Sequence, residues 1–143
     1  LRLPKAVNTI EELANGTFQE VIDDTIATAN VKKMVFCSGK FYYDLIAERE
    51  QLGREDVAIV RIEQLFPLHN DQIKAAMDRY PNVDRYVWAQ EEPKNMGSWS
   101  YMLERFELAK LECASRDYKS APAAGSSARY KRRHQQVLDK VFD

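Results

Sequence analysis

The stretch Val-Trp-Ala-Gln-Glu-Glu-Pro-Lys-Asn-Met-Gly-Ser-Trp, residues 87 to 99, decides the fold of this chain. Its apolar start, together with Tyr86, predicts a buried strand, and Pro93 ends that strand. Gly97 then leads into a helix whose apolar residues recur at helical spacing to about Lys110. An apolar strand that runs into a polar turn is typical of α/β proteins, in which open parallel sheets bind ligands beyond the carboxyl ends of their strands.

The same alternation of strand and helix extends over most of the chain. Continuous apolar runs predict three further strands, at residues 33 to 37, 57 to 62 and 111 to 115. Helical spacing of apolar residues predicts helices at residues 41 to 52, from a cap at Asn70 to Tyr80, and from Tyr130 to Val141. This order predicts an α/β fold of three layers, in which a mostly parallel sheet carries helices on both faces.

Two segments fall outside this pattern. Residues 1 to 30 contain no strand of convincing length and are predicted to be an arm or linker that packs on a neighbouring domain. The α/β domain is therefore expected to span residues 31 to 143. Residues 117 to 128 are rich in Ser, Ala, Pro and Gly and predict a loop before the last helix. The chain begins with Leu1 instead of methionine, which favours a fragment of a longer protein.

Composition narrows the class of protein. A chain of 143 residues is sized for one domain with its own core. Its net charge of -1 argues against a general binder of nucleic acid or of anionic membranes, and no apolar run approaches the roughly 20 residues of a membrane span. Cys37 and Cys113 lie in or beside apolar strands, so we expect buried free thiols and a reducing compartment.

Polar side chains follow the predicted strands. If the sheet is parallel, these side chains gather at one edge, and Ser38 and Gly39 lead into a helix N-terminus, where free backbone N–H groups favour an anion. A phosphate-bearing ligand is one interpretation, and solvated turns or a subunit contact are the others. We call these residues the strand-end crescent: Ser38, Lys40, Arg61, Gln90, Lys94 and Arg116.

Other candidate sites have weaker support. Glu91 and Glu92 are neighbours on a strand and point to opposite faces, so they do not form an acid and base pair. His69 and His134 have no cysteine or carboxylate at ligand spacing, so no metal site is predicted. The basic run from residue 129 to 133 is expected to be a solvated helix face. No Gly-Asp-Gly cofactor segment, phosphate-binding loop or nucleophile elbow occurs, so no catalytic residue is predicted.

Several motifs together resemble one enzyme family. They lie in the same order and register over nearly the whole chain: Glu-Glu-Leu-Ala-Asn-Gly-Thr-Phe at 11 to 18, Phe-Cys-Ser-Gly-Lys-Phe-Tyr-Tyr-Asp-Leu at 36 to 45, Arg-Glu-Asp-Val-Ala-Ile-Val-Arg-Ile-Glu-Gln-Leu at 54 to 65, Gln-Glu-Glu-Pro-Lys-Asn-Met-Gly-Ser-Trp at 90 to 99, and Ser-Ala-Pro-Ala-Ala-Gly-Ser-Ser at 120 to 127 with Gln-Gln at 135 and 136. They are similar to the C-terminal part of the thiamine-diphosphate-dependent first component of 2-oxoglutarate dehydrogenase complexes.

The resemblance implies a transketolase-type C-terminal domain of a homodimeric, succinyl-transferring enzyme that uses thiamine diphosphate and Mg²⁺. Both cofactors would be held by preceding domains, so this chain alone is expected to be inactive. The implied partners are those domains, the second subunit and the lipoyl-bearing succinyltransferase, in the cytoplasm or in the matrix of mitochondria. The resemblance also implies a regulatory nucleotide or acetyl-CoA site near the crescent. The alternatives are a stand-alone binding or scaffold domain and the matching domain of another thiamine-dependent enzyme.

Overall fold

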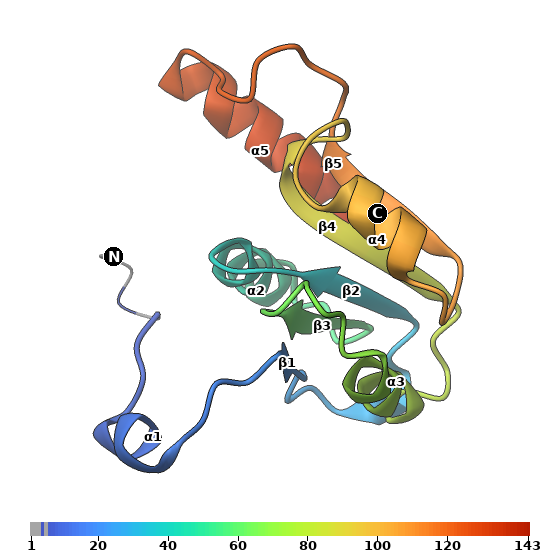
Figure 1. The fold of residues 1–143 in the computed structure, drawn as a ribbon. Helices are drawn as coiled ribbons and strands as arrows, with labels where there is room; N and C mark the ends of the chain where they lie inside the picture. Colours follow the sequence, from blue (N-terminus) through green and yellow to red (C-terminus); the bar gives the residue numbers. More distant parts are fainter. Residues whose placement is uncertain (1–3, 5) are drawn as a thin grey trace.

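A five-stranded sheet forms the centre of the protein in a computed structural model that describes residue 4 and residues 6 to 143 (Figure 1). The strands lie in the order β1-β3-β2-β4-β5, and β1 alone is antiparallel to its neighbour. Their bounds are β1 Val21–Ile22, β2 Lys33–Cys37, β3 Val57–Ile62, β4 Arg85–Pro93 and β5 Leu111–Arg116. The predicted α/β class with a mostly parallel sheet is confirmed.

Helices cover both faces of the sheet, because the strands are apolar on both sides. On β2, Met34 and Phe36 face one apolar core with α3 and α4, whereas Val35 and Cys37 face a second core with α2 and α5. The helices are α1 Ile10–Asn15, α2 Phe41–Leu52, α3 Asn70–Asp78, α4 Trp99–Arg105 and α5 Ser127–Phe142, with a 3₁₀ turn at Thr28–Asn30. None of the helices that the structure describes is long and apolar enough to cross a membrane.

The C-terminal end of α5 is held by a lysine at the start of β2. The Nζ atom of Lys33 donates hydrogen bonds to the backbone oxygens of Val141, at 2.9 Å, and Asp143, at 2.6 Å. A cation there satisfies carbonyl groups that lack partners within the helix and complements the helix dipole. Burial lowers the pKa of Lys33. The contact joins residues that are 108 and 110 positions apart.

β4 ends at Pro93 as predicted, and it includes the polar segment before that residue because Pro93 pairs with Arg116 across a register shift in which β4 has extra residues. Several predicted helix boundaries differ from the structure. α3 ends at Asp78, before the predicted end at Tyr80. α4 ends at Arg105, well before the predicted end at Lys110. Phe106 leaves the helix in an extended conformation and packs against the core ring of Phe36, 5.3 Å between centroids. The expected cap at Asn70 is also wrong, because Asn70 is the first residue of α3 itself.

The segment from residue 1 to 30, expected to be an arm, has two distinct parts. Its first part carries α1, which begins at a capping box of Thr9 and Glu12 and stands apart from the sheet (Figure 1). The side chains of Val7, Ile10 and Leu13 are exposed there. Its second part supplies β1, which pairs Val21 with Ile62 at the edge of the sheet. The sheet therefore includes a strand from within the first 30 residues.

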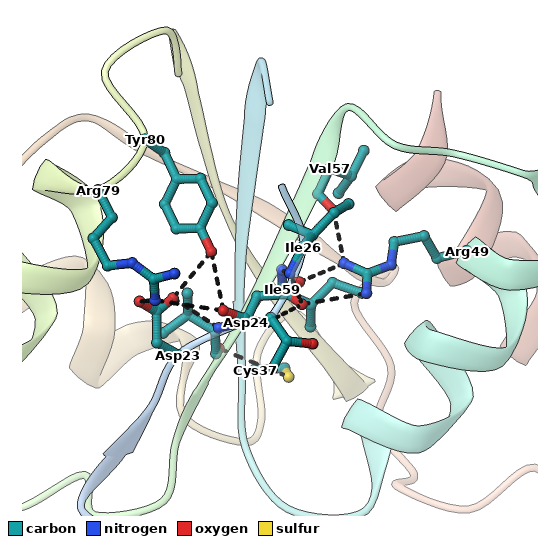
Figure 2. Close-up of polar contacts among 11 residues, drawn as sticks. Asp23, Asp24, Ile26, Cys37, Arg49, Val57, Ile59, Arg79 and Tyr80 are labelled. Carbon is teal, nitrogen blue, oxygen red and sulfur yellow. Dashed lines mark hydrogen bonds and ion pairs between the residues drawn. The ribbon is translucent and has the colours of Figure 1, made fainter. Parts of the chain in front are cut away.

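Asp24 fixes this second part to β3 (Figure 2). Continuing the β1 register would place Asp24 opposite Ile59, and there its side chain replaces the backbone acceptor that a longer strand would offer. The carboxylate accepts the backbone N–H of Ile59 at 2.6 Å and is paired with the guanidinium of Arg49, which also donates to the carbonyl of Val57 at 2.9 Å. On the other side, the Tyr80 hydroxyl donates to the carbonyl of Asp24 at 3.2 Å.

Candidate functional site

Five side chains meet between the carboxyl end of β2, the last residues of β4 and the helices α2 and α5. Lys40 precedes α2, and its ammonium lies 2.6 Å from the Oδ2 atom of Asp44 and 3.4 Å from the Oε1 atom of Glu91. From α5, the Tyr130 hydroxyl donates to the same Glu91 oxygen at 3.1 Å. The Nε2 atom of His134 lies 3.6 Å from Asp44. We call this group the carboxylate–histidine cluster: Lys40, Asp44, Glu91, Tyr130 and His134.

The imidazole of His134 is held between aromatic rings. It stacks on Tyr130, 5.4 Å between centroids, and meets the edge of Phe41 at 5.7 Å. Its Nδ1 atom lies 3.9 Å from Glu91. This packing holds the ring so that each of its nitrogens faces one carboxylate.

A metal ion is not assigned to the cluster. One ligand atom each from Asp44, Glu91 and His134 lie within 4.8 Å of one another. However, the ammonium of Lys40 already contacts both carboxylates. Burial is the largest single influence and disfavours the charged form of Lys40, but the hydrogen bond to Asp44 and the nearby charge of Glu91 together raise the pKa of Lys40. The cluster therefore carries its own cation.

Gln90 of the crescent is buried and serves the backbone turn that follows β4. Its amide oxygen accepts the indole N–H of Trp88 at 2.9 Å, and its amide nitrogen donates to the carbonyls of Pro93 at 3.2 Å and Met96 at 2.7 Å. Gly97 lies against it with φ of +66°, and an added Cβ there would meet the Gln90 amide at 3.0 Å. These contacts commit the polar groups of Gln90 to the turn.

Arg61, at the end of β3, forms an ion pair with another residue of this chain. Its Nε atom lies 3.0 Å from the Oε1 atom of Glu63, and its guanidinium stacks over the ring of Tyr42 at 4.7 Å. The same Glu63 oxygen accepts the backbone N–H of Gly39 at 3.0 Å. Hence the backbone N–H of Gly39, which was expected to be free for a ligand anion, already binds the carboxylate of Glu63.

The other crescent residues divide into two groups. Ser38, Lys40 and Gln90 share a cavity of about 260 Å³ that also includes Glu91. Arg116 lies farther along the sheet edge, where its guanidinium donates to the carbonyl of Glu91 and, at 3.0 Å, to that of Pro122. The ammonium of Lys94 lies 6.0 Å from the ring centroid of Trp99. The structure therefore brings three of the six residues together and places Arg61, Lys94 and Arg116 apart from them.

Sequence reasoning missed the carboxylate–histidine cluster and Asp24. His134 and Glu91 come from α5 and β4, and they approach each other only because α5 packs across the sheet. No local spacing connects either residue to Asp44. The alternating pattern of β4 does carry one usable signal, because Glu91 shares the face of Val87 and Ala89, which α5 covers.

Comparisons with known proteins agree on one family. Residues 7 to 142 match the family model described as 2-oxoglutarate dehydrogenase C-terminal. The chain is 44% identical to the 2-oxoadipate dehydrogenase complex component E1 of Rattus norvegicus and 42% identical to the 2-oxoglutarate dehydrogenase E1 component of Haemophilus influenzae. In each case, 99% of this chain and 16% of the relative are covered. The chain thus spans about one sixth of the length of these relatives.

A solved structure supports the fold. The chain is similar to a structure titled split gene transketolase, inactive beta4 tetramer, with a TM-score of 0.56 and 15% sequence identity. The similarity covers 82% of this chain and 40% of that one. At this identity the likeness concerns the fold alone, and it matches the predicted transketolase-type domain.

Proposed function

Because the chain belongs to the 2-oxoglutarate dehydrogenase C-terminal family, we propose that it is the C-terminal domain of a thiamine-diphosphate-dependent 2-oxo acid dehydrogenase. The match over residues 7 to 142 carries this proposal, together with the identity to two kinds of E1 component. The whole enzyme would decarboxylate 2-oxoglutarate and transfer the succinyl group to a lipoyl-bearing succinyltransferase. We place it in the cytoplasm, or in the mitochondrial matrix of a eukaryote.

The chain's own role would be structural. Its 143 residues contain no Gly-Asp-Gly segment for a diphosphate and its metal, and Lys40 already contacts both carboxylates of the cluster. Thiamine diphosphate and Mg²⁺ are therefore assigned to preceding domains. The exposed apolar side chains around α1 support contact with those domains or with the second subunit of a homodimer. Titrating the isolated chain with thiamine diphosphate and Mg²⁺ should give no heat of specific binding.

The substrate is tested in the intact protein. With thiamine diphosphate, Mg²⁺ and an artificial electron acceptor, it should oxidise 2-oxoglutarate faster than 2-oxoadipate. The 44% identity to a 2-oxoadipate dehydrogenase component favours 2-oxoadipate as the second candidate, and the reverse preference would support that candidate. Inactivity on both acids under conditions in which a known E1 component is active would contradict the enzymatic assignment and favour a stand-alone binding or scaffold domain.

A regulatory nucleotide or acetyl-CoA site also remains a proposal for the strand-end crescent. The cavity that contains Ser38 and Lys40 is about 260 Å³, enough for one phosphoryl group but small for a whole nucleotide, because ligand pockets measure roughly 300 to 1,000 Å³. Titration of AMP and acetyl-CoA into wild type and into the Lys40→Ala, Arg61→Ala and Arg116→Ala variants tests it. Equal binding by all four proteins would remove the crescent from the effector site.

A further inference from the structure

A basic groove lies between the end of β5 and the outer side of α5. Its volume is about 580 Å³, within the range of roughly 300 to 1,000 Å³ that small-molecule sites occupy. Five cationic side chains line this groove, but only two carboxylates do, although the net charge of the whole chain is -1. The cations are Arg116, Lys119, Arg132, Arg133 and Lys140, and we call this cavity the basic groove.

The helical repeat explains why two residues of the basic run, Arg132 and Arg133, line this groove. Arg132, Arg133 and Gln136 lie within about one turn of each other on α5, and Lys140 follows one turn later. Val137 and Val141 lie beside this row on the helix surface and are buried in the core. Arg132 is exposed and Arg133 is half-buried, and both line a cavity with the loop after β5.

Two of the five cations are occupied by groups of the protein itself. Lys140 contacts the carbonyl of Ser115 at 3.0 Å and the carboxylate of Asp117 at 3.2 Å. Arg116 donates to the carbonyls of Glu91 and Pro122. Asp139, the second carboxylate of the groove, accepts a hydrogen bond from a glutamine of α5 at 3.1 Å.

The other three cations have no such partner. Within the part of the chain that the structure describes, the side chains of Lys119, Arg132 and Arg133 make no hydrogen bond or ion pair. Placing three unpaired cations around one cavity costs electrostatic free energy, because like charges repel. An anion with several charges would remove that cost.

We propose that the basic groove binds a small oligoanion that bears phosphoryl groups, with a diphosphate as the simplest example. The lining is mostly polar, which does not suit an apolar ligand. Arg132 and Arg133 offer two guanidinium forks, and Lys119 faces them from the loop. Together they have more N–H donors than one carboxylate can satisfy, whereas a diphosphate offers oxygens at both ends. This proposal does not depend on the enzymatic assignment.

The test is calorimetric titration of inorganic pyrophosphate into the intact protein at fixed ionic strength and without Mg²⁺. Wild type should show saturable binding. Arg132→Ala and Arg133→Ala should each weaken it about tenfold or more, because each removes charge-assisted hydrogen bonds. Arg133→Lys keeps the charge but loses the fork, so it should also bind more weakly than wild type.

Lys131→Ala is the matched control, because Lys131 is an exposed cation on the same helix that does not line the groove. It should bind pyrophosphate like wild type. The proposal is overturned if wild type shows no saturable binding, or if Lys131→Ala weakens binding as much as the arginine variants do. Citrate binding as tightly as pyrophosphate would overturn the phosphoryl class. Tighter binding of a single-stranded oligonucleotide through the same residues would overturn the small-molecule class.

Discussion

Replacing Asp24 by asparagine should destabilise the protein by about 3 kcal/mol. The side chain of Asp24 is 2% exposed and pairs with that of Arg49, which is 13% exposed. Removing one partner of a buried ion pair costs roughly 3 to 5 kcal/mol, because the other charge stays buried without compensation. Asparagine retains one oxygen for the Ile59 N–H, so the lower end of that range applies. The Asp24→Ala variant also leaves this amide unpaired and should be less stable still.

Thermal and urea unfolding of the chain measure this effect, and the melting temperature of Asp24→Asn should fall by roughly 10 °C. Asp78→Asn is the control, because Asp78 forms an exposed ion pair with Lys74, and such pairs contribute about 0 to 1 kcal/mol. The double variant Asp24→Asn with Arg49→Met should lose less stability than the sum of the losses in the two single variants. A loss below about 1 kcal/mol for Asp24→Asn, or no greater than for Asp78→Asn, would refute the reasoning.

Three further predictions concern single groups. Gly97→Ala should lower the free energy of unfolding by more than about 1 kcal/mol, which a chemical denaturation series measures. The φ of +66° at this position disfavours a side chain, and the new Cβ would meet Gln90. Hydrogen bonding from Arg54 lowers the pKa of Asp56. This pair therefore stabilises the fold above the ordinary carboxyl pKa, and the stabilisation is lost as the pH falls through the lowered value. In the Arg54→Gln variant, carbon-detected NMR titration should show the pKa of Asp56 returning toward its ordinary value. Burial raises the pKa of the Cys37 thiol, so a thiol reagent at pH 8 should label Cys37 far more slowly in the native protein than in denaturant.

Local pattern was sufficient to predict most elements of this fold. β2, β3 and α2 have the bounds expected from their sequences, because an apolar run without alternation and a run with helical spacing are properties of neighbouring residues. Gly53, at φ of 62°, caps α2 directly after its predicted last residue. The three-layer arrangement then follows, because strands that are apolar on both sides need helices on both faces.

Contacts between distant residues decided the rest. Val21 and Ile22 became a strand because β3 had an open edge, and Asp24 became an anchor because the N–H of Ile59 lay opposite it. His134 meets Asp44 and Glu91 across elements that no sequence spacing connects. Arg61 was expected to face a ligand but pairs with Glu63. Charge and residue type therefore identified the polar edge of the sheet, whereas the partner of each charge depended on the side chains that packing brought within a few ångströms.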